Sequence, residues 1–151
     1  ILALLHDRRF LSGLARSDRK MIARHVPESH ILSQESAERA VSSKNNWVIK
    51  PLDAYGSRGV AIGRMLTARA WKAELKLALK AGRYLLQEFT AAPRSAVLRL
   101  VNGRPKLSSE MTSVGFFLYD GKLAGPYVRS GPRHPLSISY GAVTRPGFVC
   151  E

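Results

Sequence analysis

The sequence predicts an α+β fold, with a helix-rich first part and an antiparallel sheet at the end. Helical periodicity dominates residues 2–43, and a strand–loop–strand–helix–strand pattern occupies residues 46–90. After residue 94, apolar runs are joined by Asn-Gly and Asp-Gly pairs, which are typical of tight β-hairpin turns. We therefore expect two units that meet near residues 87–94.

Three helices are expected before the first strand. Residues 2–15 space their leucines at near-helical intervals. Ser17 is a candidate N-cap for a second short helix, which Pro27 ends. The polar run over residues 33–43 predicts a third, exposed helix.

The middle of the chain predicts two strands, a helix and another strand. The first strand covers residues 47–50, and a loop separates it from an apolar run over 59–63. Thr67 and Gly82 are the expected start and stop of a helix, and residues 83–90 follow as a strand. One face of that helix gathers apolar side chains: Trp71, Leu75, Ala78 and Leu79.

The last third of the chain predicts hairpins. Asn102-Gly103 and Asp120-Gly121 each stand between strand-like runs and accept the positive φ angles of a type I′ turn. A final strand is expected over residues 136–143.

The overall composition limits the class of protein. The 151 residues are 45% hydrophobic, which is enough for a folded core, and their net charge of +13 favours anionic partners. Cys150 is the only cysteine, so no disulfide forms within the chain, which fits the cytoplasm. No apolar run is long enough to span a membrane. Both ends look cut, so we expect a piece of a longer polypeptide.

The loop inside residues 47–63, "WVIKPLDAYGSRGVAIG", is the strongest candidate site. Lys50 ends a strand, and Pro51 restricts the backbone that follows it. The Gly-Ser-Arg-Gly segment at 56–59 adds two residues that accept unusual backbone angles, a hydroxyl and a cation. Backbone N–H groups and two positive charges suit a polyphosphate. The lysine precedes the glycines, so this is not a Walker A loop. An ordinary hairpin with a long loop remains the alternative.

This loop, followed by "YLLQEF" at residues 84–89, resembles the ATP-grasp superfamily. The similarity is greatest to bacterial circularly permuted ATP-grasp proteins related to glutathionylspermidine synthase, and it runs from about residue 4 to residue 147. It implies a helical lead-in (1–45), a lid subdomain (46–90) and part of an antiparallel-sheet subdomain (91–151).

The resemblance also implies roles for residues around ATP. Lys50 would contact the α- and β-phosphates, and the glycine-rich loop would close over the β- and γ-phosphates. The loop residues are Gly56, Ser57, Arg58 and Gly59. The hinge residues that would frame the adenine are Gln87, Glu88 and Phe89. Val48 and Leu86 would sandwich its ring.

Two further cations are assigned by the same resemblance. Lys20 would be a second phosphate-binding lysine, the alternative being a solvated helix lysine. Arg129 would be catalytic and face the transferring phosphoryl group, the alternative being a charged strand end that points to water.

The implied function is that of an ATP-dependent ligase. Such an enzyme uses Mg²⁺ and ATP to activate a carboxylate as an acyl phosphate, which an amine or a thiol then attacks. The family's Glu-x-Asn metal motif is absent, so the metal ligands are unknown. Glu110 is the best remaining candidate, since Asp120 is explained as a turn residue. The site is therefore either incomplete in this chain or degenerate, and the carboxylate and amine substrates are unidentified.

The alternative function is a non-catalytic nucleic-acid-binding or interaction domain. The charge favours it, and hairpin aromatics can stack on bases. However, Phe117 and Tyr119 share one strand face while Phe116 points the other way, which a two-layer core explains better. Nucleic acid is therefore disfavoured as a partner.

Overall fold

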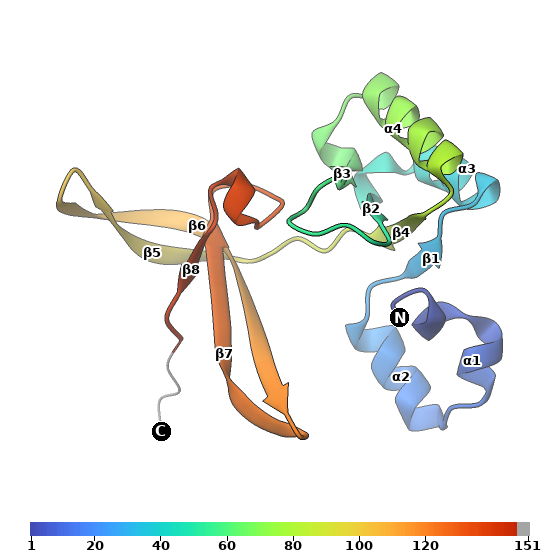
Figure 1. The fold of residues 1–151 in the computed structure, drawn as a ribbon, viewed down its shortest axis with the longest axis horizontal. Helices are drawn as coiled ribbons and strands as arrows, with labels where there is room; N and C mark the ends of the chain where they lie inside the picture. The colour runs from blue at the N-terminus through green and yellow to red at the C-terminus, as the bar shows by residue number, and fades with distance from the viewer. Residues whose placement is uncertain (148–151) are drawn as a thin grey trace. The chain divides into compact units, whose positions relative to one another are not determined.

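The computed structural model describes residues 1–147 and has a mixed α+β fold with two antiparallel four-stranded sheets (Figure 1). This confirms the α+β class. The chain divides after Thr90 into two compact units, called here the first unit and the second unit. Residues 1–45 and 46–90 both belong to the first unit. Cys150 lies outside the described residues, and no described helix is long and apolar enough to cross a membrane.

The first unit contains four α-helices, three short 3-10 turns and four strands within residues 1–90. In chain order these are η1 (Leu4–His6), α1 (Arg8–Ser12), α2 (Arg16–His25), β1 (Ser29–Ile31), α3 (Gln34–Ser42), η2 (Lys44–Asn46), β2 (Trp47–Pro51), β3 (Ala61–Ile62), η3 (Gly63–Met65), α4 (Ala68–Ala81) and β4 (Tyr84–Glu88). The strand order in the sheet is β1-β4-β2-β3, and every neighbouring pair is antiparallel.

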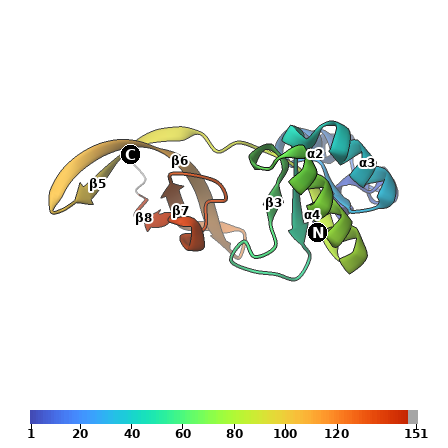
Figure 2. The same ribbon diagram turned by 90° about the horizontal axis from the view of Figure 1, so that it is seen from above.

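Helices α3 and α4 lie side by side on one face of this sheet (Figures 1 and 2). Their buried faces pack against alternate residues of β2 and β4, because successive side chains of a strand point to opposite faces of the sheet. The buried cluster consists of Ala37, Ala40, Trp47, Ile49, Trp71, Leu75, Ala78 and Leu86. The opposite face of the same strands therefore carries the intervening residues, which include Lys50 and Gln87.

Helix α4 forms where the sequence predicts it. The Thr67 side chain accepts a hydrogen bond from the Ala70 N–H at 3.2 Å, and Gly82 ends the helix with a left-handed φ of 70°. Trp71 is 1% exposed, and its indole Nε1–H donates to the Ala40 carbonyl of α3 at 2.9 Å. The predicted apolar face is thus the face that holds the two helices together.

Three expectations for the first unit are corrected. Helix α2 begins at Arg16 after Ala15, so Ser17 lies inside the helix and is not its cap. Strand β1 was not expected in the helical lead-in, yet it pairs with β4 along the sheet edge. Helix α3 is not simply an exposed helix, because Ala37 and Ala40 are buried in the core.

The second unit is a single coiled sheet with one 3-10 turn among its described residues. Its elements are β5 (Arg94–Val101), β6 (Arg104–Tyr119), β7 (Lys122–Gly131), η4 (Ile138–Tyr140) and β8 (Val143–Arg145), and the strand order is β5-β6-β7-β8. Strand β6 is long and strongly curved (Figure 2). Both hairpin turns have the predicted backbone, with positive φ at Asn102-Gly103 and at Asp120-Gly121.

Two expectations for the second unit are wrong. The strand expected over 136–143 is a 3-10 turn that Gly141 ends with a φ of 83°, and β8 begins only at Val143. The hairpin aromatics are not in a two-layer core: Phe116 is 63% and Tyr119 81% exposed. Within the described part of this unit, no helix or second sheet packs over that end of the hairpin.

Candidate functional site

Lys50 lies near the end of β2, on the sheet face opposite the two helices. Its ammonium donates a hydrogen bond to the Gln87 side-chain carbonyl on the neighbouring strand β4. Gln87 is buried and donates in turn to the Ser29 hydroxyl of β1 at 3.1 Å. A polar network therefore runs across three strands. Burial lowers the pKa of Lys50, so its charge is poorly solvated and an anion beside it would be stabilised.

The 52–60 loop begins two residues after Lys50 and joins β2 to β3. Gly56, Ser57 and Gly59 have φ angles of 63°, 62° and 68°, so three of its residues are left-handed. Such backbone turns successive N–H groups toward one side, which is how anion-binding loops form. Ser57 is not a glycine and bears a steric cost of about 1 kcal/mol in this conformation.

Arg58 places a guanidinium at the exposed part of the loop. It lies 5.0 Å from the ring centroid of Tyr55 and donates to the Tyr55 hydroxyl at 3.4 Å. Tyr55 is 74% exposed and was not predicted as a site residue. Tyr55 directly precedes Gly56 and lies three residues before Arg58. An aromatic ring so close to an arginine in one loop is the sequence feature that could have identified it, because such a ring can stack on a guanidinium.

The two loop glycines differ in their surroundings, and this leads to a prediction. A Cβ at Gly59 would lie 2.7 Å from Pro51 Cγ, whereas one at Gly56 would meet nothing within 4 Å. Gly56→Ala should cost about 1 kcal/mol for its backbone angle alone. Gly59→Ala should cost about 2 kcal/mol or more because contact with Pro51 is added. Urea unfolding followed by tryptophan fluorescence measures both variants, and equal losses would contradict the close approach.

The predicted hinge residues lie at the end of β4, where their backbone donors are already used. The Glu88 N–H donates to the Glu28 carbonyl and the Phe89 N–H to the Asn46 carbonyl, both at 2.7 Å. The guanidinium of Arg64 covers the Phe89 ring at 4.1 Å from its centroid. Adenine recognition at this strand end would therefore depend on carbonyl oxygens and on the exposed Glu88 side chain.

The expected ring sandwich of Val48 and Leu86 is wrong. Leu86 pairs with Ile49 and belongs to the helix-side core, where it is fully buried. Val48 pairs with Gln87 and points to the opposite face. Leu85, which pairs with Lys50, is the leucine that shares the face of Val48.

Of the other predicted cations, Lys20 makes no described contact with Lys50, and Arg129 belongs to the other unit. Lys20 is exposed on α2, which lies apart from the β2–β3 hairpin (Figure 1). Arg129 belongs to the second unit and is half-buried on β7, so it is not a strand end that points to water. Its guanidinium donates to the Leu136 carbonyl at 2.9 Å and to the Tyr127 hydroxyl.

Glu110 is not available as the metal ligand considered above. Its carboxylate accepts hydrogen bonds from Arg99, from Arg145 at 3.5 Å and from the Ser130 hydroxyl at 2.8 Å. Two guanidinium groups already neutralise this carboxylate, which disfavours it as a metal ligand. Among residues 1–147, no three His, Cys, Asp or Glu side chains group as a metal site would require.

Neither a scan against models of protein families nor a search of curated proteins finds a match to this chain.

Proposed function

We propose that the first unit binds the phosphates of ATP with Lys50 and the 52–60 loop. The chain would then be the ATP-binding portion of an ATP-grasp-type ligase. ATP transfers its γ-phosphoryl group to a carboxylate, which gives an acyl phosphate and ADP. An amine or a thiol then attacks the acyl carbon, and inorganic phosphate leaves. The carboxylate and the acceptor are unidentified, and Mg²⁺ ligands are not assigned in the described residues.

One observation carries this proposal: the cation of Lys50 and the left-handed loop belong to one hairpin, beside the strand that holds Gln87. The ammonium is half-buried, its one bond among residues 1–147 is to a neutral amide, and burial lowers its pKa. A phosphate oxygen would be a stronger acceptor for it than that amide. The loop's left-handed residues, which include two glycines, and its exposed arginine would let it close over the remaining phosphates and exclude water.

The test compares Lys50→Ala with Lys72→Ala in a calorimetric titration with ATP and Mg²⁺. Lys72 is exposed on α4 and has the same charge, so it controls for the overall positive field. Lys50→Ala should weaken binding roughly 10- to 100-fold, the value of one charge-assisted hydrogen bond, and leave the fold intact. Equal ATP affinity in Lys50→Ala and wild type, or an equal loss in both variants, would refute a specific clamp.

A second candidate function is binding of single-stranded nucleic acid by the second unit. It is favoured by the aromatics of the β6–β7 hairpin, because Phe116, Phe117 and Tyr119 are all more than half exposed. Exposed rings near Lys122 provide stacking surfaces and a cation. A short single-stranded oligonucleotide in the same titration separates the two: binding that falls steeply with salt, without saturable ATP binding, would support this candidate instead.

A further inference from the structure

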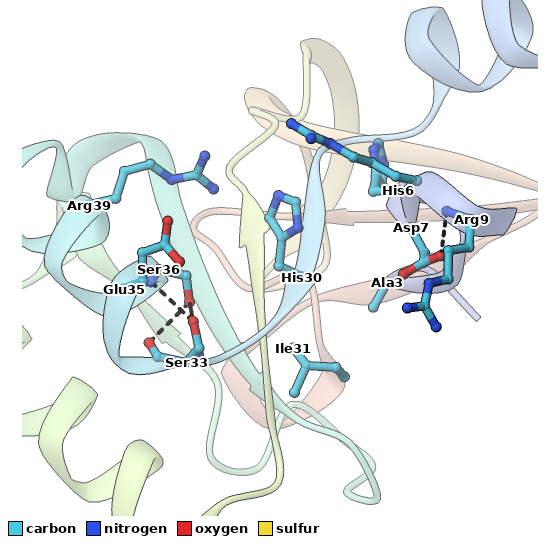
Figure 3. A pocket seen from close by; sticks show the side chains of 11 residues that line it. Ala3, His6, Asp7, Arg9, His30, Ile31, Ser33, Glu35, Ser36 and Arg39 are labelled. Atoms are coloured by element: carbon cyan, nitrogen blue, oxygen red, sulfur yellow. Dashed lines mark hydrogen bonds between the residues drawn. The ribbon is translucent and has the colours of Figure 1, made fainter. Parts of the chain in front are cut away.

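A pocket of about 680 Å³ in the first unit is lined by residues from 3–9 and 30–39 and by none from the 52–60 loop. It is bounded by η1 and α1 on one side and by β1 and the start of α3 on the other (Figure 3). The lining residues that matter here are His6, Arg8, Arg9, His30, Ser33 and Arg39. None of the residues assigned to ATP lines it. Its volume suits a small molecule.

Three arginines from two distant segments line the pocket. Arg39 is paired with Glu28 at 2.9 Å. The side chains of Arg8 and Arg9 are exposed and make no ion pair with any described residue. Guanidinium groups without partners at a concave surface favour phosphate, which they bind through two parallel hydrogen bonds.

Two histidines also line the pocket, although the sequence predicts only scattered histidines. The rings of His6 and His30 lie 6.2 Å apart, and both line the pocket (Figure 3). His30 Nε2 bonds to Glu28 at 2.7 Å. His6 Nε2 is buried without a hydrogen-bond partner. A buried imidazole nitrogen without a partner is uncommon in a folded protein.

The start of α3 adds a positive electrostatic contribution. Ser33 caps this nine-residue helix through a reciprocal bond with Ser36, and both serines line the pocket. The positive end of the helix dipole therefore faces the cavity.

Two acidic residues also line the pocket. The Asp7 carboxylate accepts hydrogen bonds from the N–H groups of Arg9 and Phe10, while Glu35 makes no described bond. A hydroxyl or amino group on the ligand would match Glu35.

We infer that this pocket binds the phosphate group of a small molecule at a site separate from the ATP loop. Arg8 and Arg9 supply the unpaired charges, the rings of His6 and His30 line the site, and the start of α3 supplies the helix dipole. The shared chemistry is a phosphate dianion, which could come from inorganic phosphate or from a phosphate ester.

Histidine ring signals in proton NMR provide a local readout of this site. The chain has four histidines, and His25 on exposed α2 serves as an internal control. Inorganic phosphate and glycerol 3-phosphate are titrated separately into the full chain at constant pH and ionic strength. The signals of His6 and His30 should shift saturably while that of His25 stays constant. Tighter binding of glycerol 3-phosphate identifies the ester as the ligand, and tighter binding of inorganic phosphate identifies the free anion.

Variants make the test decisive. The double variant Arg8→Gln/Arg9→Gln should weaken phosphate binding at least tenfold, whereas Arg69→Gln on α4 should leave it unchanged. Absence of a saturable shift, equal shifts of all histidines, or full affinity in the double variant would overturn the inference.

Discussion

Replacing Trp71 by alanine is expected to destabilise the first unit by about 4 kcal/mol, the typical cost of removing a large aromatic from a core. Trp71 is 1% exposed and belongs to the cluster that joins α3, α4 and the sheet. Its removal leaves a cavity and also leaves the Ala40 carbonyl without its indole donor. Urea unfolding followed by the fluorescence of the remaining Trp47 measures this loss.

Trp71→Phe is the matched control, because it keeps most of the ring and removes the indole N–H. It should cost about 1–2 kcal/mol, since it removes a hydrogen bond and a smaller volume. If Trp71→Ala lost less than about 1 kcal/mol, the helix–helix contact described above would not be the core of this unit.

Replacing Glu110 by glutamine is expected to cost the second unit about 3 kcal/mol near neutral pH, because it leaves two half-buried arginines without their buried counter-charge. Glu110 is 3% exposed and accepts bonds from Arg99, Arg145 and Ser130. Asp120→Asn is the matched control. It makes the same chemical change at an exposed turn, where asparagine accepts the left-handed φ of 49°.

The pH dependence of this effect has a definite sign. Burial alone would raise the pKa of Glu110, but hydrogen bonds from Arg99 and Ser130, the charge of Arg99 and a bond from Arg145 lower it from 4.5 to about 2. The fold therefore favours the ionised form. Its stabilisation is fully present above about pH 4.5 and is lost as the pH falls toward 2. The difference between wild type and Glu110→Gln should shrink over that window.

Amide hydrogen exchange over residues 94–131 is the suitable measurement. Both tryptophans belong to the first unit, so their fluorescence reports nothing of the second. Faster exchange in Glu110→Gln should be confined to the second unit. Unchanged exchange in this variant, or a difference that grows as the pH falls below 4.5, would show that the carboxylate is not the organising group of that sheet.

The sequence predicts those elements whose signals are local. Helix α4 follows from Thr67, Gly82 and the spacing of its apolar face, because capping depends on adjacent residues. The hairpin turns follow from Asn102-Gly103 and Asp120-Gly121 for the same reason, and all four residues have the positive φ angles expected.

Elements that depend on distant partners were missed. Strand β1 has only three residues, and its formation depends on pairing with β4 more than fifty residues later in the chain. The exposed aromatics of the β6–β7 hairpin were misassigned because strand parity shows which side chains share a face but not whether that face is covered.

The candidate site shows the same division. Lys50 and the left-handed glycines are visible in the sequence, since residue type alone indicates charge and backbone freedom. The bond from Lys50 to Gln87 and the pairing of Phe89 with Asn46 depend on strand register, which short motifs do not fix. The histidine–arginine pocket was missed because its lining comes from two segments that are brought together only by folding.

Amide hydrogen exchange of the 52–60 loop, with and without ATP and Mg²⁺, tests the phosphate-clamp proposal most directly. We predict saturable protection of peptides that cover residues 50–62, which a single-stranded oligonucleotide does not reproduce and moderate salt does not abolish. Unchanged exchange in this loop at saturating ATP would contradict the proposal. So would protection that spreads over the basic surface of both units and disappears with added salt.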